Sequence, residues 1–245
     1  MADVAKMTKE QVARYIDQAY VLDIACTTKN IDDLMTSVRK YKFGAICLLP
    51  YHTEYVAREM GDFCREQDIK ISAALSFPFG QSVTSVKLNE AREMIKLGAT
   101  QLDLACNASA LKEKRYDYYL NELKEYAKIA DDAGVLSKAI IQVHVLTDEE
   151  IRIATQLVIE AGIGQCKTTT GENTGLRPNF HDLEIIKGVF DEMKPEKTEM
   201  KFCTGSLLEV YGFIQAGCTS VGTSLGVEVC EKLPLYQSWI RRSRE

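Results

Sequence analysis

The segment TDEEIRIATQLVIEAGIGQCKTTTG, residues 147–171, contains one complete unit of the structure that the chain repeats. Thr147, followed three positions later by Glu150, has the pattern of a capping box, so a helix is expected to begin there. That helix is expected to end at Ala161-Gly162, because glycine readily adopts the left-handed conformation that closes helices. A short strand carrying Lys167 follows and leads into a polar turn. This succession of helix, glycine and strand is typical of parallel α/β folds.

The same joint between helix, glycine and strand recurs at Phe43-Gly44, Leu97-Gly98 and Ala216-Gly217. After an opening helix at about residues 8–18, eight strands are expected: 20–25, 44–49, 69–77, 99–105, 138–145, the strand around Lys167, 199–203 and 219–222. Parallel βαβ units in this number predict a (β/α)8 TIM barrel with a short N-terminal helix, forming a single domain over residues 1–245. The alternative is a doubly wound open sheet, but no G-x-G-x-x-G follows the first strand.

Composition excludes several classes of protein. The net charge of -5 gives no general attraction to nucleic acid or to anionic membranes, and no apolar run reaches transmembrane length. The eight cysteines form no C-x-x-C pair, and the N-terminus lacks a signal peptide, so we expect a cytoplasmic protein without disulfides. The three histidines show no metal-ligand spacing, so no metal site is expected.

Side chains alternate between the two faces of a strand, so the apolar positions indicate which residues point into the barrel. If Cys166 faces the helices, Lys167 points inward. The same rule places further polar side chains in the interior: Lys201, Asp103, Asp23, Lys138, Gln142 and His144. Several of these lie near the carboxyl ends of strands, where the active sites of barrels form.

This set of residues predicts Schiff-base chemistry. Lys201 lies on the strand next to Lys167, and one ammonium group is expected to lower the pKa of the other. A neutral lysine can attack an aldehyde, and Asp103 can move the protons that the reaction requires, without a metal or an organic cofactor. Two structural alternatives are a lysine that extends to water from a strand end and a buried network of ion pairs that only closes the barrel.

Lys167-Thr168-Thr169-Thr170-Gly171 resembles the K-T-S-T-G signature of the deoxyribose-phosphate aldolases. Further motifs of that family match in order and spacing: Ala45-Ile46-Cys47, Ser76-Phe77-Pro78-Phe79-Gly80, Gln101-Leu102-Asp103, Leu146-Thr147-Asp148-Glu149-Glu150 and Gly222-Thr223-Ser224. The resemblance implies a class I aldolase of (β/α)8 fold that interconverts 2-deoxyribose 5-phosphate with acetaldehyde and glyceraldehyde 3-phosphate. It implies that Lys167 forms the Schiff base and that Lys201 and Asp103 assist.

The candidate substrate-binding residues are Asp23, Cys47, Gln142, Thr170, Gly171, Gly205, Thr223 and Ser224. The chain departs from the family at several of these places. Asp23-Ile24-Ala25 is found where the family usually has Asp-His-Thr on its first strand, and Gln142 is found where the family commonly has a glutamate. Thr204-Gly205 replaces a Gly-Gly turn that binds phosphate, while Glu172 and Leu225 occupy positions where the family often has a lysine or aromatic residue and a serine. These departures predict an intact catalytic centre and an altered phosphate cup.

Three functional hypotheses follow. The first is an aldolase acting on 2-deoxyribose 5-phosphate or a close relative; the second is a Schiff-base lyase with an unphosphorylated substrate or a ketone donor; the third is a non-catalytic barrel. Each of the first two implies a small aldehyde or sugar as the partner, and we expect a homo-oligomer. Cys47 and His144 are expected to line or pack rather than react. The basic tail, residues 239–245, is expected to be a solvated end.

Overall fold

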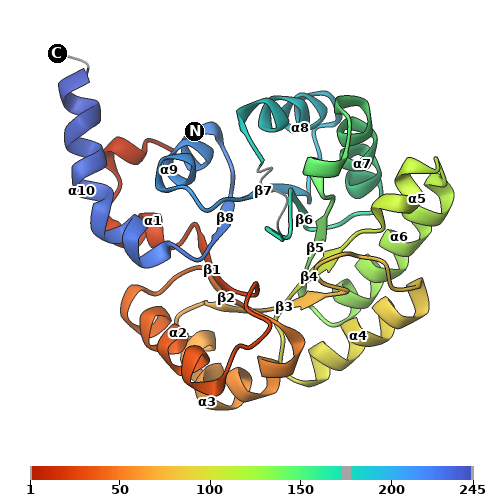
Figure 1. Cartoon of the computed structure of the whole chain (residues 1–245), viewed down its shortest axis with the longest axis horizontal. Coiled ribbons are helices and arrows are strands. Elements are labelled where there is room, and N and C mark those ends of the chain that lie inside the picture. The colour runs from red at the N-terminus through yellow and green to blue at the C-terminus, as the bar shows by residue number, and fades with distance from the viewer. Residues whose placement is uncertain (1, 173–177, 244–245) are drawn as a thin grey trace.

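Eight parallel strands close into a barrel with helices around it (Figure 1). The computed structural model describes residues 2–172 and 178–243. The strands are β1 (Ile16–Tyr20), β2 (Ala45–Leu48), β3 (Lys70–Leu75), β4 (Gln101–Ala105), β5 (Leu136–Ile140), β6 (Gln165–Lys167), β7 (Glu199–Cys203) and β8 (Ser220–Thr223). Each strand pairs with the next, and β8 pairs with β1. The predicted (β/α)8 TIM barrel is confirmed; that residues 1–245 form a single domain stays a prediction.

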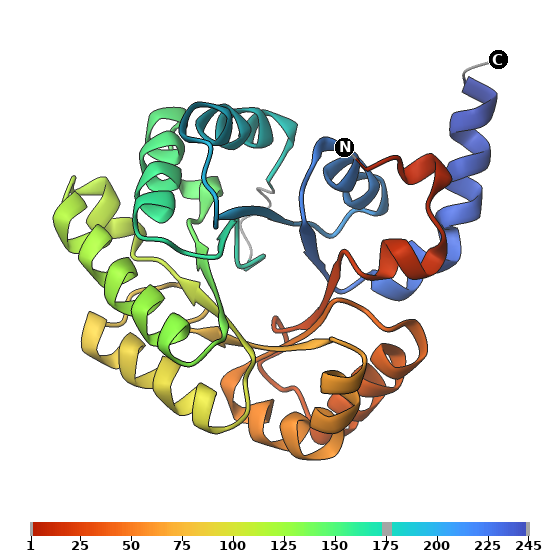
Figure 2. The same cartoon turned by 180° about the vertical axis from the view of Figure 1, so that it is seen from behind.

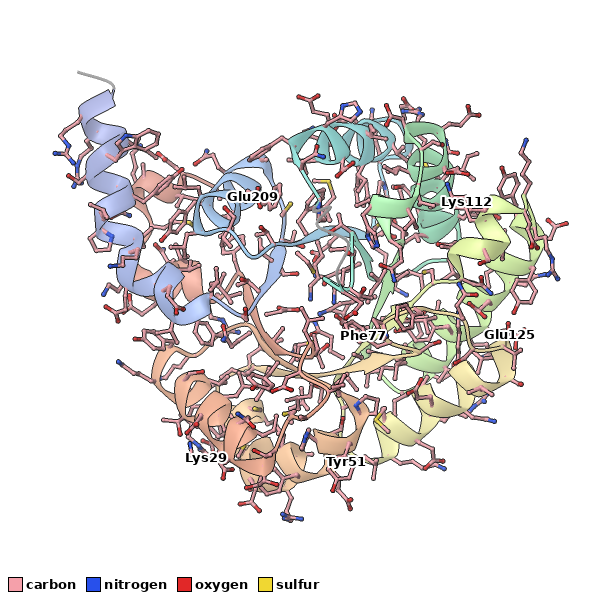
Figure 3. All side chains as sticks on the ribbon, viewed as in Figure 1. Lys29, Tyr51, Phe77, Lys112, Glu125 and Glu209 are labelled. Atoms are coloured by element: carbon pink, nitrogen blue, oxygen red, sulfur yellow. The ribbon has the colours of Figure 1, made fainter. Side chains whose placement is uncertain are left out.

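Helices connect successive strands on the outside of the barrel. They are η1 (Val4–Lys6), α1 (Lys9–Ala13), α2 (Thr28–Tyr41), η2 (Pro50–His52), α3 (Thr53–Glu66), α4 (Thr84–Lys96), α5 (Ala108–Lys112), α6 (Tyr116–Asp132), η3 (Val143–Val145), α7 (Asp148–Glu160), α8 (Phe180–Met193), α9 (Leu207–Ala216) and α10 (Gly226–Ser243). From either side, α10 packs beside α1 and then projects away from the barrel (Figures 1 and 2). Charged side chains such as Lys29, Lys112 and Glu125 lie on the outer rim (Figure 3).

The predicted local signals act as expected at most joints. Thr147 and Glu150 form the capping box at the start of α7, with reciprocal hydrogen bonds of 3.3 and 2.8 Å. Gly98, Gly162 and Gly217 have positive φ just after their helices. Gly44 serves a different purpose, because Lys42 takes the left-handed position, with a φ of 54°. A Cβ on Gly44 would lie 2.4 Å from the carbonyl oxygen of Arg14, so this glycine permits a close approach of two chain segments.

The first strand is not where the sequence suggested. The expected helix 8–18 and strand 20–25 are replaced by the short α1 and by β1 at Ile16–Tyr20, which pairs Asp17 with Ala45 and with Gly222. Ile16 is fully buried, whereas Leu22 and Ile24 are 53% and 101% exposed. Residues 21–25 of the apolar run are therefore a loop after β1, because the strand register is decided by pairing with β2 and β8 rather than by local hydrophobicity.

The barrel interior carries charge, and its outer face carries the apolar core. Leu102, Leu104, Cys166 and Phe202 are buried among the residues that pack the strands against the helices. The alternate positions point inward, so register sets pairs of polar residues side by side: Asp103 with Lys138, and Lys167 with Lys201. Strand parity thus predicted the interior correctly wherever the strand itself was correctly placed.

A second buried charge pair, outside the barrel, ties α4 to α6. The Nζ of Lys87 lies 2.7 Å from Oε1 of Glu122, and the side chains are 0% and 2% exposed. The hydroxyl of Thr84 donates a hydrogen bond of 2.7 Å to the other carboxylate oxygen. Every acceptor of this buried carboxylate therefore has a partner, which makes the pair dependent on each member.

We expect Lys87→Met to lower the free energy of unfolding by about 3–5 kcal/mol, because it leaves the Glu122 carboxylate buried without a counterion. Urea denaturation followed by circular dichroism measures the change. The matched control is the double variant Lys87→Met/Glu122→Gln, which removes both charges and should recover more than half of the loss. A double variant no more stable than the single one would show that the pair is not the cause.

Candidate active site

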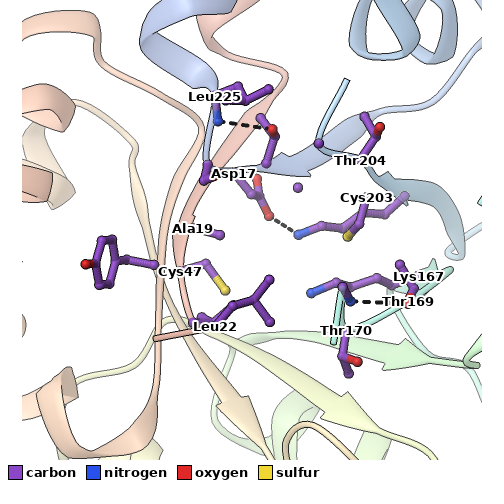
Figure 4. A pocket seen from close by; sticks show the side chains of 18 of the residues that line it. Asp17, Ala19, Leu22, Cys47, Lys167, Thr169, Thr170, Cys203, Thr204 and Leu225 are labelled. Carbon is purple, nitrogen blue, oxygen red and sulfur yellow. Dashed lines mark hydrogen bonds and ion pairs between the residues drawn. The ribbon is translucent and has the colours of Figure 1, made fainter. Parts of the chain in front are cut away.

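A cavity of about 620 Å³ opens at the carboxyl ends of the strands. It is lined by residues of β1, β2, β6, β7 and β8 and of the loops that follow them. Lys167 and Cys47 extend into it from opposite sides (Figure 4). The position is the one at which barrels of this class place their chemistry, and the size suits a small organic molecule.

Three lysines and two aspartates form one network of ion pairs at the base of the cavity. Lys167 contacts Oδ2 of Asp103, and the second oxygen of Asp103 lies 3.2 Å from Nζ of Lys138. Lys138 also lies 2.5 Å from Asp17, which contacts Lys201 as well. The exposed fraction of these side chains is at most 7%. With three ammonium groups facing two carboxylates, one lysine can lose its proton and leave the network neutral.

Burial and charge act in opposite directions on each of these groups. Burial is the largest effect and would by itself lower the pKa of Lys167, but Asp103, with smaller effects from Cys203 and Cys47, more than offsets it and raises that pKa above its ordinary value. The pKa of Lys201 is raised well above its ordinary value, because Asp103 and Asp17 outweigh its burial. Burial dominates at Lys138, whose pKa is lowered despite the two carboxylates, with Lys201 and Lys167 adding to the effect. The same lysines hold the pKa of Asp103 well below its ordinary value, against the effect of burial.

This arrangement corrects one prediction. Lys201 does disfavour charge on Lys167, as expected from their neighbouring strands, but the pKa of Lys167 is raised because Asp103 is in direct contact. The lysine with the lowered pKa is Lys138. Contact with Asp103 therefore favours the ammonium form of Lys167, whereas burial favours the neutral form of Lys138.

Asp103 is fixed by further contacts on the β3 and β2 sides. The hydroxyl of Ser72 donates a hydrogen bond of 2.9 Å to Oδ1, and Sγ of Cys47 lies 3.9 Å from Oδ2. Burial raises the pKa of the Cys47 thiol, and Asp103 adds to that shift. Cys47 lines the cavity, and its raised pKa favours the neutral thiol over the reactive thiolate; that it does not react stays a prediction.

Asp17 is the functional residue that the sequence analysis missed. Strand parity selected Asp23 for the first strand, but Asp23 lies in the loop after β1, where it accepts hydrogen bonds from the Tyr20 hydroxyl at 3.1 Å and the Ala25 amide at 2.9 Å. Asp23 still lines the cavity. Asp17-Gln18-Ala19 lies on β1 and begins with an aspartate inside the barrel, so it occupies the first-strand position at which Asp23-Ile24-Ala25 was expected. Comparing the family's Asp-His-Thr pattern with the residues after Asp17 as well as after Asp23 would have identified both aspartates as candidates.

The other predicted residues divide into two groups. Those that line the cavity are Cys47, Thr170, Gly171, Gly205, Thr223 and Ser224. Gln142 and His144, both expected on a strand, instead follow the end of β5, and neither is among the lining residues. His144 is half-buried, with Nδ1 3.2 Å from the Thr169 hydroxyl, and burial lowers its pKa, against the smaller effect of Asp182. Lys138 was placed inside by parity but was given no role.

The loops after β7 and β8 form the rim where the altered phosphate cup was predicted. The hydroxyl of Thr204 contacts Glu209, a residue of α9 (Figure 3), and accepts a hydrogen bond of 3.0 Å from the Ser206 amide. The Leu225 amide donates to the Thr223 hydroxyl at 3.1 Å, and the Gly226 amide donates to Gln18 at 2.9 Å. Three loop amides are therefore already bound to side chains of the protein.

Among residues 2–172 and 178–243, no three His, Cys, Asp or Glu side chains are grouped so as to hold a metal ion. Within the same described residues, no helix is both long and apolar enough to cross a membrane. All eight cysteines are free thiols.

Comparison with known proteins identifies relatives over most of the chain, although no family model matches it. The chain is 34% identical to a deoxyribose-phosphate aldolase of Thermococcus kodakarensis over 93% of this chain and 99% of that one. It is 29% identical to a deoxyribose-phosphate aldolase of Bacteroides thetaiotaomicron over 93% and 92% of the two chains. Among solved structures, an aldolase called QR15 superposes with a TM-score of 0.82 at 28% identity, covering 94% of this chain and 98% of that one.

We expect Asp17→Asn to slow imine formation with a small aldehyde by roughly 100-fold. Without Asp17, the Lys138 and Lys201 ammonium groups both turn to Asp103, which diverts this carboxylate from Lys167. The rate is measured by trapping the imine with borohydride over time.

The matched comparison is Asp23→Asn, the aspartate that parity selected, for which we expect a loss of less than about threefold because Asp23 does not touch the network. Equal losses in the two variants, or a larger loss at Asp23, would contradict this assignment. Circular dichroism of both variants checks that the barrel has folded.

Proposed function

The chain belongs to the deoxyribose-phosphate aldolase family, and on that premise we propose that it is a class I aldolase that reversibly cleaves 2-deoxyribose 5-phosphate to acetaldehyde and glyceraldehyde 3-phosphate. The observation that carries the proposal is the contact between Lys167 and Asp103 at the base of the cavity. A lysine that faces the cavity and contacts a buried carboxylate has an acceptor for its proton. The same carboxylate then stabilises the positive charge of the iminium ion that forms on the lysine.

The network supplies a path for that proton. Lys167 passes it to Oδ2 of Asp103, whose other oxygen lies 3.2 Å from Lys138, the lysine with the lowered pKa. The neutral amine then attacks the carbonyl carbon of the substrate. The attacking nitrogen releases a proton to the network and the alkoxide oxygen takes one up, which gives a neutral carbinolamine. Loss of water, with a proton returned from the network, leaves an iminium ion on Lys167.

Cleavage of the carbon–carbon bond follows from the iminium charge. A base removes the proton of the hydroxyl at the reacting carbon, the bond breaks, and the electron pair moves into the iminium to form an enamine while the aldehyde product leaves. Protonation of the enamine carbon and addition of water then release acetaldehyde and restore Lys167. The iminium carries the same charge as the Lys167 ammonium, so the carboxylates that stabilise one also stabilise the other.

Lys201 and Asp17 complete the electrostatic frame. Asp17 contacts Lys201 and lies 2.5 Å from Lys138, so its single negative charge partly offsets the two cations on this side of the network. Lys201 lies 3.8 Å from that oxygen and lines the cavity. In this proposal Asp103 moves the proton, and Lys201 stabilises the negative charge that develops on substrate oxygens.

The phosphate is proposed to lie against Gly205, Thr223 and Ser224, which line the cavity beyond Lys201. Asp23, Cys47, Thr170 and Gly171 would line the remainder of the substrate. One observation favours the second candidate function, an unphosphorylated substrate: the Ser206, Leu225 and Gly226 amides are held by side chains of the protein, and Thr204 contacts the Glu209 carboxylate. An anion at this rim would have to compete with these bonds.

A homo-oligomer and a cytoplasmic location also remain proposals. Support for the first comes from Leu235 and Trp239 on the projecting α10, which are 63% and 58% exposed. Apolar side chains of this size on a helix face are common in subunit contacts. Support for the second comes from eight unpaired cysteines, which suit a reducing compartment.

Borohydride trapping tests the proposed function. Incubation with 2-deoxyribose 5-phosphate, unphosphorylated 2-deoxyribose or acetaldehyde, followed by reduction and peptide mapping, should give an adduct at Lys167. The adduct should disappear in Lys167→Leu and persist in Lys112→Leu, a matched change on the surface. We expect cleavage of the phosphorylated sugar to be faster than cleavage of the other; the reverse order would favour the unphosphorylated substrate. A folded protein that gives no adduct with any of the three compounds would refute the Schiff-base assignment.

A further inference from the structure

Gln142 lies directly after β5 in a backbone conformation that glutamine rarely adopts. Its φ is 64° and its ψ is 50°, which is the left-handed region, and its side chain is buried, with 5% exposed. A residue other than glycine in this region costs free energy unless surrounding contacts hold it. The contacts of the Gln142 side chain therefore hold its backbone in this conformation.

The amide of Gln142 joins two loops of the active-site face. Its nitrogen donates a hydrogen bond of 2.7 Å to the carbonyl oxygen of Pro78, in the loop after β3. Its oxygen accepts from the Thr170 amide at 3.4 Å and from the Thr170 hydroxyl at 3.3 Å. The orientation of the side-chain amide is fixed by this chemistry, because a carbonyl can only accept and a backbone amide can only donate.

Thr170 connects these contacts with the candidate active site. It stands three residues after Lys167 and lines the cavity, in which its side chain is labelled in Figure 4. The chain before it is held by β-type bonds, from the Ile141 amide to the Lys167 carbonyl at 2.9 Å and from the Val143 amide to the Thr168 carbonyl at 3.0 Å. These backbone hydrogen bonds end at Thr168, and beyond them the Gln142 side chain contacts Thr170.

We propose that Gln142 is a positioning residue of the aldolase site: its amide fixes Thr170, and with it the cavity wall beyond Lys167, against the Pro78 carbonyl. The proposal rests on the function proposed above. The role requires an amide, since a carboxylate has no proton to donate and would place a negative oxygen against the carbonyl oxygen of Pro78. The glutamate that the family often has at this position is therefore not interchangeable with Gln142 in this chain.

The substitution Gln142→Glu tests the proposal, because it changes the donor while preserving size. We expect kcat/KM for cleavage of 2-deoxyribose 5-phosphate to fall about 10- to 100-fold with a rise in KM, because Thr170 shifts at the wall that holds the sugar. Trapping of the acetaldehyde imine should stay within about threefold of wild type, since Lys167 and Asp103 are untouched. A variant that had simply lost its fold would lose both activities.

The matched control is Gln237→Glu. Gln237 on α10 also donates its side-chain amide to backbone carbonyls, those of Val4 at 3.1 Å and Met7 at 2.8 Å, but lies outside the cavity lining. This variant should keep wild-type kcat/KM. If Gln142→Glu does not fold, Gln142→Met, which is uncharged and similar in length, takes its place with the same expected split between the two activities.

The possible results distinguish failure of the proposed aldolase function from failure of the proposed role of Gln142. A wild-type protein that forms no imine would overturn the proposed function. An active wild type whose kcat/KM is matched by the folded Gln142 variant would overturn the role of Gln142. Loss of imine trapping in step with loss of cleavage would also overturn it, because it would show general disruption of the site rather than displacement of the wall.

Discussion

The proposed mechanism depends on Asp103, whose two carboxylate oxygens contact two different lysines. One oxygen contacts Lys167 and the other lies 3.2 Å from Lys138, so a single carboxylate connects the lysine that must lose a proton with the lysine that burial most favours in its neutral form. Burial makes this connection effective, because charges in a medium of low dielectric interact strongly and are not screened by salt. It also makes the members of the network depend on one another, because the cost of burying each charged group is offset only by its partners.

The closed barrel is what makes such a concentration of charge possible. Parallel strands in register set inward positions side by side, so Asp103 adjoins Lys138 and Lys167 adjoins Lys201 without any long or flexible connection. The apolar positions between them, such as Leu104 and Cys166, pack outward against the helices. One fold therefore provides both a dry scaffold and a polar interior, and the loops at the carboxyl ends supply the walls of the cavity.

Sequence alone predicted the parts of this site that follow from period and parity. The eight-fold alternation gave the barrel, and the inward positions of Lys167, Lys201, Asp103 and Lys138 followed from their apolar neighbours. The method failed where the strand was misplaced: the run 20–25 is more apolar than Ile16–Tyr20, but pairing with β2 and β8 selects the latter, so Asp23 was chosen in place of Asp17. It could not predict pKa directions, which depend on distances, nor loop contacts such as those of Gln142, which join segments 64 residues apart.

The most direct test of the central claim is to measure the charge states of the three buried lysines by NMR titration of their side-chain ammonium groups, assigned through single Lys→Arg or Lys→Met variants. The account predicts that Lys138 loses its proton first as pH rises, below the ordinary lysine pKa, while Lys167 and Lys201 remain charged above it. The order should change in Asp103→Asn, where Lys167 loses the carboxylate that holds its proton. A wild-type protein in which Lys167 is neutral at rest and Lys138 is the last of the three to titrate would contradict the proposed path from Lys167 through Asp103 to Lys138.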